Sequence, residues 1–252
     1  MYAVREAALG EGHRETAEAA SGLACALYDL GGEEDLLRAR DLHERSLATL
    51  ESIGGPSSRD ALEEALCLAE TLVRLKGPES LDRAAALYQR VLHARERDLG
   101  PDHALTLEAA AGLATSLQLR KASEEDLARA QALQERVLAG CQKSLGRDHP
   151  LAAEAAEALA RCIWERDSPD YATALTLQRQ AHEALSRAMG PDHPRTLDSL
   201  QNVGEALWRL GELPESRKTF ARVAEARARI LGPQHPDTKS SLDWLRLLDG
   251  RE

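Results

Sequence analysis

The chain is poor in aromatic residues, and long hydrophobic runs are missing from it. Phe, Trp and Tyr make up only 3% of its 252 residues, while the hydrophobic content is 43%, so the core must be built mainly from Ala and Leu. These residues favour closely packed helices and form poor strands, and period-two runs of Val, Ile and Thr are absent. No run of eighteen apolar residues is present, so we expect no membrane-spanning helix. The first residues lack the apolar segment of a signal peptide, so we expect no secretory leader.

The chain has no excess of positive charge, and it contains only four cysteines. The formal net charge is −10, which argues against a nucleic-acid partner and, more weakly, against binding to anionic membrane surfaces. The four cysteines, Cys25, Cys67, Cys141 and Cys162, form no C-x-x-C pair and lie within helical patterns. We interpret them as buried reduced thiols that act as small hydrophobic residues. These features together predict a cytoplasmic protein.

The motifs that mark common enzymes are missing as well. The sequence contains no phosphate-binding G-x-x-x-x-G-K-[ST], no dinucleotide-binding G-x-G-x-x-G, no G-x-S-x-G and no H-E-x-x-H pattern. We therefore predict a non-enzymatic protein with no catalytic residue, no cofactor and no metal site.

What the chain does have is a repeat. A helical pattern ends on glycine and is followed by a short polar turn, usually with histidine, at regular intervals along the chain. These marker glycines are Gly10, Gly55, Gly100, Gly146, Gly190 and Gly232. A nearly constant spacing of this length is typical of a repeat array, in which each unit is one supersecondary structure stacked on the next.

Each repeat contains signals for two helices. In the repeat that follows Gly100, apolar spacing predicts a helix over 106–117, and Ser123 is a good N-cap for a second helix over 127–145 that ends at Gly146. In the next repeat, Ser168-Pro169-Asp170 predicts a helix start with Pro169 at the first helical position.

Small residues recur at equivalent points of both helices. In the first helices they are Ala24, Ala69, Ala114, Ala160 and Gly204, and in the second helices they are Ala39, Ala84, Ala130, Ala174 and Ser216. Small side chains allow two helix backbones to approach closely, and a hairpin with one such face must bury it against a neighbour. The pattern predicts stacked helical hairpins.

These features resemble the tetratricopeptide repeat, in the longer form found in kinesin light chains. The best match runs from Thr196-Leu197-Asp198 through Asn202-Val203-Gly204 and Gly211-Glu212-Leu213-Pro214 to Gly232-Pro233-Gln234-His235-Pro236. The resemblance covers essentially the whole chain. It implies an all-α, right-handed solenoid of stacked antiparallel helix pairs, the tetratricopeptide superhelix, with about eleven helices.

The repeat boundaries follow from the marker glycines. We expect a single array over 1–252, in which 1–10 is the tail of a preceding helix, 11–55, 56–100, 101–146, 147–190 and 191–232 are five helix pairs, and 233–252 is a capping helix. Because the chain opens in mid-repeat, we also consider that it is a piece of a longer protein.

The recurring histidines invite a metal site, but the repeat geometry opposes one. Equivalent residues of successive two-helix units lie about 16–20 Å apart, since packed helices are about 8–10 Å apart. Zinc ligands must all lie about 2 Å from the ion. We therefore expect the histidines to close the turn and to help start the next helix.

An acid stands six residues before each small residue of the first helices. The five acids are Glu18, Glu63, Glu108, Glu154 and Asp198. The resemblance implies that first helices line the concave surface, so these acids are candidates for a ladder in a ligand groove that selects a basic segment. The alternative is that they complement the helix dipole in the first turn.

Aromatic residues and one asparagine complete the candidate groove. Tyr28, Trp164 and Trp208 share one repeat position, and they either anchor a peptide or pack between helices. Asn202 matches an asparagine with which kinesin-light-chain-like repeats grip a ligand backbone. Its counterparts here (Gly22, Cys67, Gly112 and Ala158) are unable to do so, which moves any specific contact toward the last two repeats. Its expected polar neighbours are Arg161, Glu205 and Arg209.

We therefore predict an adaptor, a non-catalytic scaffold that binds a peptide or protein segment in its concave groove, and the acid ladder favours a basic segment. The alternative is a sensor or regulatory array cut from a larger signalling protein, such as a kinase or nucleotide-binding switch, with the activity outside this chain. Self-association through the terminal repeats is a third possibility.

Overall fold

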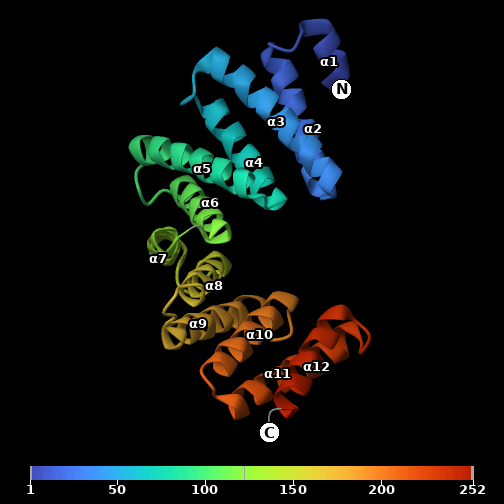
Figure 1. Cartoon of the computed structure of the whole chain (residues 1–252), viewed down its shortest axis with the longest axis vertical. Helices are drawn as coiled ribbons and strands as arrows, with labels where there is room; N and C mark the ends of the chain where they lie inside the picture. Colours follow the sequence, from blue (N-terminus) through green and yellow to red (C-terminus); the bar gives the residue numbers. More distant parts are fainter. Residues whose placement is uncertain (1, 122, 251–252) are drawn as a thin grey trace. The chain divides into compact units, whose positions relative to one another are not determined.

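The computed structural model describes residues 2–121 and 123–250, and these residues form helices joined by short turns (Figure 1). The twelve helices of this part of the chain are α1 (Tyr2–Leu9), α2 (Arg14–Leu30), α3 (Glu33–Gly54), α4 (Arg59–Leu75), α5 (Pro78–Leu99), α6 (Ala104–Arg120), α7 (Glu124–Leu145), α8 (Pro150–Trp164), α9 (Tyr171–Met189), α10 (Pro194–Arg209), α11 (Leu213–Leu231) and α12 (Pro236–Asp249). About eleven were expected, and the additional one is the short α1.

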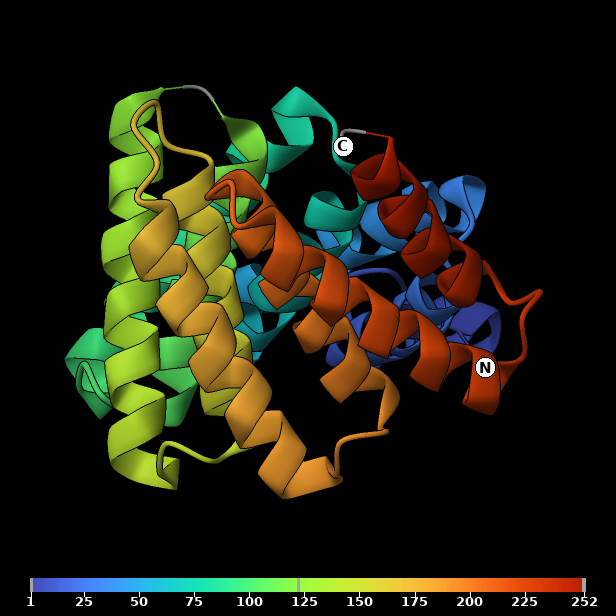
Figure 2. The ribbon, with the colours of Figure 1, turned by 90° about the horizontal axis from the view of Figure 1, so that it is seen from below.

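The chain divides into two compact units, 1–133 and 134–252, with the boundary inside α7. In the first unit, each helix from α1 to α6 packs against the next one along the chain. The same holds in the second unit from α8 to α12, where α11 contacts both α10 and α12 (Figure 2). In the first unit, α4 also contacts α2 and α6, so successive first helices are neighbours. The predicted all-α fold of sequentially stacked helix pairs is confirmed.

The small residues lie where the helices cross, as predicted. The eight alanines of the two series are completely buried, as is Ser216, and Gly204 is buried too. The hydroxyl of Ser216 on α11 donates a hydrogen bond of 2.8 Å to the carbonyl oxygen of Gly204 on α10. A side chain as short as serine reaches the facing backbone because the two helices approach closely at this point.

A second buried series lies one turn further along the second helices. Four residues after each small residue stand His43, Tyr88, Gln134, Gln178 and Phe220, all of them between 0% and 5% exposed. The same repeat position thus carries a large side chain in every second helix, but its chemistry differs from repeat to repeat.

Helix starts agree with the sequence prediction except in one repeat. The hydroxyl of Ser123 accepts from the backbone N–H of Asp126 at 3.1 Å, as an N-cap does. The prediction for α9 was wrong, because Asp170 is the N-cap and Pro169 precedes the helix. The Asp170 carboxylate accepts from the backbone N–H of Thr173 at 3.0 Å, and a carboxylate in this position satisfies the N-terminal N–H groups directly.

The interpretation of the cysteines was only partly right. Cys162 is buried, and burial raises the pKa of its thiol to about 12. Cys67 and Cys141 are half-buried, but Cys25 is exposed on α2. Cys25 lies just after the buried Ala24, so the helical turn carries its side chain out of the core.

Candidate functional site

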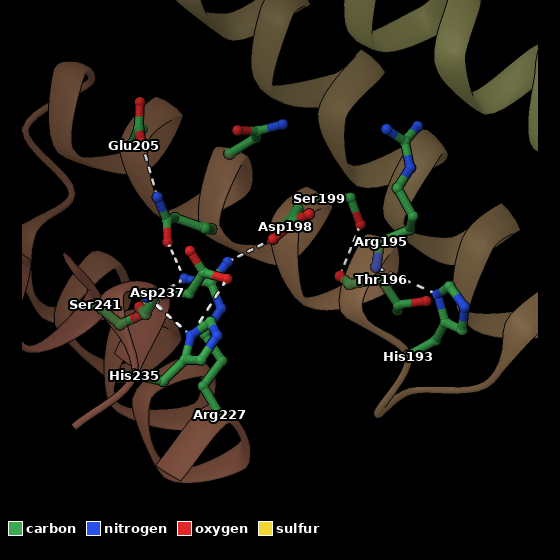
Figure 3. Close-up of polar contacts among 12 residues, drawn as sticks. His193, Arg195, Thr196, Asp198, Ser199, Glu205, Arg227, His235, Asp237 and Ser241 are labelled. Atoms are coloured by element: carbon green, nitrogen blue, oxygen red, sulfur yellow. Dashed lines mark hydrogen bonds and ion pairs between the residues drawn. The ribbon is translucent and has the colours of Figure 1, made fainter. Parts of the chain in front are cut away.

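The histidines of the turns are helix caps, as expected. In His13, His103, His149, His193 and His235 the imidazole Nδ1 accepts from the backbone N–H two residues further on, and each of these histidines has extended backbone angles. Figure 3 shows two of them, His193 and His235. These bonds satisfy N–H groups that have no partner within the helix. Over residues 2–121 and 123–250, no group of three His, Cys, Asp or Glu side chains is placed to hold a metal ion.

The five acids occupy one structural position. Each is the fifth residue of its helix, and each side chain is between 50% and 55% exposed. The helix dipole acts mainly within the first turn. Residues at the fifth position lie beyond that turn, so the dipole does not account for the series.

Every one of these acids forms an ion pair with an arginine. Two partners are exposed and lie four residues earlier on the same helix, with Arg14 3.0 Å from Glu18 and Arg59 2.8 Å from Glu63. Glu154 on α8 pairs at 3.0 Å with the exposed Arg195 of α10. Pairs of this kind contribute little to stability because water screens them.

The remaining two acids bind buried arginines. The guanidinium of Arg95 donates to the Glu108 carboxylate at 2.9 Å and to the Leu105 carbonyl at 2.5 Å. The guanidinium of Arg227 donates to Asp198 at 2.6 Å.

Arg227 has three further acceptors, Gln201, Ser241 and the Asp237 carbonyl, so it links α10, α11 and α12 (Figure 3). Sequence reasoning missed both arginines. Their signal was present, because each stands five residues before a marker glycine.

Two of the three aromatic side chains are covered by an arginine of the next first helix. The guanidinium carbon of Arg74 lies 4.4 Å from the ring centre of Tyr28, and that of Arg209 lies 4.8 Å from the ring centre of Trp164. These are cation–π distances. Trp164 also packs against buried residues of α9 and α10, namely Leu175, Val203, Ala206 and Leu207.

Trp208 has a different environment. Its ring meets the ring of Trp244 edge to face, with centres 5.4 Å apart, and Trp244 stacks in turn on the buried Phe220 at 4.9 Å. Trp208 thus takes part in a cluster of rings from α10, α11 and α12.

A pocket of about 450 Å³ lies between α8, α9 and α10 in the second unit. It is lined by Glu157, Arg161, Trp164, Glu165, Tyr171, Gln178, Asn202, Glu205 and Arg209. Five of these residues, Arg161, Trp164, Asn202, Glu205 and Arg209, were singled out from the sequence. Trp208 does not line it, and the other four lining residues, Glu157, Glu165, Tyr171 and Gln178, were missed. Glu157 lies three residues after Glu154 on the same helix face, which is the signal that sequence reasoning overlooked.

The pocket carries charges of both signs around neutral polar groups. Burial raises the pKa of the Glu157 carboxyl, against the opposing effect of Arg195 and a 3.4 Å hydrogen bond from the Asn202 amide. Burial also raises the pKa of Glu205, and Gln201 and Arg209 oppose the shift. The two carboxyls therefore hold their negative charge less readily than carboxyls in water.

The helices are too polar or too short to cross a bilayer. Within the described residues, none of them combines the length and the apolar character that a membrane span requires.

Two segments of the chain, 106–151 and 163–223, match the tetratricopeptide repeat family. Among solved structures, the chain is similar to a putative kinesin light chain of Podosopora anserina with nearly identical TPR-like repeats. A single-substitution form of that protein superposes with a TM-score of 0.73 at 20% sequence identity, and the alignment covers 87% of this chain and 98% of the chain of that protein. A second structure of that protein has a TM-score of 0.72 at 20% identity, with 86% and 98% covered. BtubC (BKLC) from P. vanneervenii has a TM-score of 0.68 at 18% identity, with 88% and 84% covered. No curated protein matches the sequence significantly.

The chain is thus a repeat protein built from stacked helix pairs. Two of its segments match the tetratricopeptide repeat, and its fold is that of the kinesin-light-chain-like repeat proteins. Repeats of this family generally mediate protein–protein interactions.

Proposed function

We propose that the chain is a scaffold that binds a peptide or protein segment, and that part of this segment is held in the pocket between α8, α9 and α10. The observation that carries the proposal is the pocket itself, in which two successive first helices bring five of the expected groove residues together. Its volume is in the range of specific ligand sites. Its lining includes tryptophan and arginine, which are enriched at the energetic centres of protein interfaces.

Within each unit, the acids at the fifth position of the first helices are a further part of the proposal, in which they give binding a preference for a basic segment. Glu18, Glu63 and Glu154 support this part of the proposal, because their arginine partners are exposed. A lysine or arginine of a bound segment replaces such a partner at little cost. Glu108 and Asp198 are less suited to the role, since each holds a buried arginine.

The pocket is tested by selection from a displayed library of random peptides with the purified chain, followed by affinity measurement on the enriched peptides. Arg161 is exposed at the pocket and is changed by Arg161→Glu, with Arg246→Glu on α12 as the matched control. We expect the pocket variant to weaken binding at least about tenfold, as loss of an interface hot spot does. Failure to enrich any peptide, or equal affinity of both variants, contradicts the proposal.

The preference for basic segments is tested on the same peptides with Glu63→Lys and Glu154→Lys, and with Glu79→Lys on α5 as the control. Weaker binding of basic peptides by the first two variants supports a binding role for the acids, and unchanged binding contradicts that role. Sedimentation of the free chain over a range of concentrations separates binding of a foreign segment from self-association.

A further inference from the structure

Gln178 on α9 is the most deeply buried polar side chain of the pocket. It is 1% exposed, and neither its amide nitrogen nor its amide oxygen has a hydrogen-bond partner among the described residues. The indole N–H of Trp164, which lines the same pocket, is likewise buried and unpaired within that part of the chain. Buried polar groups almost always have partners, so two such groups at one pocket call for an explanation.

The fold itself does not require an amide at this position. Three of its four repeat counterparts have well-defined surroundings: the His43 imidazole lies 2.7 Å from the Glu64 carboxylate, Tyr88 packs beside Gly112, and Phe220 stacks on Trp244. The fourth, Gln134, leaves its amide oxygen unpaired within the described residues, but it does not line the pocket. An apolar residue would fill the position without a desolvation cost. What distinguishes Gln178 is that both of its amide atoms are unpaired at a pocket that also holds the unpaired Trp164 indole, and this combination points to binding rather than to packing.

The chemistry of the unpaired groups defines what they recognise. The Gln178 amide offers N–H donors and a carbonyl acceptor, and the Trp164 indole adds one more donor. A carboxamide complements both the donors and the acceptor of the Gln178 amide, because its own oxygen accepts and its neighbouring NH₂ group donates. The charged residues that line the pocket include both signs, Glu157 and Glu205 as well as Arg161 and Arg209, and so favour neither a cation nor an anion.

We infer that the pocket takes the uncharged carboxamide side chain of an asparagine or glutamine in the bound segment, which exchanges hydrogen bonds with Gln178. The inference rests on the proposed function and specifies the side chain that this site reads. The Gln178 amide is buried in the free chain. Asn202 stands at the repeat position of Gly112, and Tyr88, the counterpart of Gln178 in that repeat, packs beside Gly112. By this correspondence Asn202 lies next to Gln178. The bond from Asn202 to Glu157 is long at 3.4 Å and therefore weak, so a bound carboxamide would displace the Asn202 side chain at little cost.

The test uses the tightest peptide from the library selection, with each of its asparagines and glutamines replaced in turn by alanine and by aspartate. We expect one such replacement to weaken binding at least about tenfold, because it leaves a buried amide unpaired. Gln178→Leu is expected to lower the affinity for the parent peptide by a similar factor. It should not lower further the affinity for the peptide whose critical asparagine or glutamine has been replaced, because the two residues would act through one shared contact. Gln178→Glu is expected to lower the affinity for the parent peptide as well.

The stability of the variant separates recognition from a structural role. Gln178→Leu removes an unpaired buried amide, so its melting temperature should equal or exceed that of the parent chain. Gln134→Leu is the matched control, since Gln134 shares the repeat position but lies outside the pocket, and its peptide affinity should be unchanged.

Three results overturn the inference: a tight peptide that is insensitive to all of its asparagine and glutamine replacements, unchanged affinity in Gln178→Leu, or a lowered melting temperature of that variant. In each of these cases peptide binding itself stands. If no peptide is enriched, the proposed function fails and the inference with it.

Discussion

The ring of Tyr88 on α5 fills the space that a side chain at Gly112 on α6 would need. A Cβ atom placed on Gly112 would lie 2.2 Å from Cε1 of Tyr88, far inside van der Waals contact. Gly22 holds the same repeat position on α2, and a Cβ atom there would meet nothing within 4 Å. The same repeat position therefore requires glycine at Gly112, for a steric reason, but not at Gly22.

Gly112→Ala and Gly22→Ala should consequently change stability in opposite directions. We expect Gly112→Ala to lower the free energy of unfolding by about 1–3 kcal/mol through overpacking. Gly22→Ala should raise it by up to about 1 kcal/mol, because alanine is the better helix former at an open site. Urea unfolding followed by helical circular dichroism measures both. A destabilising Gly22→Ala, or a neutral Gly112→Ala, would contradict the structural account.

The cation–π contact between Arg209 and Trp164 is a second measurable link between successive first helices. At an exposed site such a contact is worth about 0.5–1 kcal/mol, so Arg209→Met should lower the free energy of unfolding by that amount. A double-mutant cycle with Trp164→Leu isolates the pairwise contribution. A coupling energy of zero would show that the arginine lies over the ring without stabilising it.

Loss of the acid should matter most where its arginine is buried. Asp198→Asn weakens the carboxylate contact of Arg227, which is only 6% exposed, and we expect a loss of about 1–2 kcal/mol in unfolding free energy. Glu63→Gln breaks an exposed pair within one helix, for which about 0.3–0.5 kcal/mol is typical. Equal effects of the two substitutions, measured by urea unfolding at pH 7, would rule out the distinction between the buried and the exposed arginines.

The pocket carboxyls predict a pH dependence of stability. The pKa of Glu157 is raised in the folded state, chiefly by burial, so the folded chain holds its proton more tightly than the unfolded chain. The favourable contribution of this group is complete below the unfolded pKa of about 4.3 and is lost as the pH rises through the folded pKa. Glu157→Gln removes this loss, so its stability relative to the parent chain should increase from about pH 4.5 to about pH 7.

Asp126 provides a control of opposite sign. A hydrogen bond from Arg120 is the main cause that lowers the pKa of Asp126, so this carboxylate stabilises the fold above its unfolded pKa and loses the effect as the pH falls. Asp126→Asn should therefore become less stable relative to the parent chain as the pH rises toward the unfolded pKa of aspartate, about 3.9, and should change little above about pH 5. Urea unfolding at several pH values from about 3 to about 7 tests both substitutions, and slopes of the same sign would refute the assignment.

The local features of the fold were determined by the sequence. All six marker glycines have φ between 83° and 92°, a region that other residues avoid, and the histidine caps bind an N–H group only two residues away. Such features depend on neighbouring residues, and the buried alanines depend only on side-chain size. They could therefore be predicted without knowing how the helices pack. The prediction failed at Pro169 because two neighbouring residues, Ser168 and Asp170, are both good N-caps, and local sequence does not distinguish them; the structure uses Asp170.

The partners of the candidate site residues were decided by the tertiary structure. The sequence placed Glu108 and Asp198 in one series with Glu63, but the packing of α5 and α11 gave two of them buried arginines. It likewise grouped Trp208 with Trp164, whereas contact with α12 placed Trp208 among other rings. Repeat position determines where a side chain stands on its own helix. What it touches depends on residues that differ from repeat to repeat on the neighbouring helices, and only the folded arrangement brings these together.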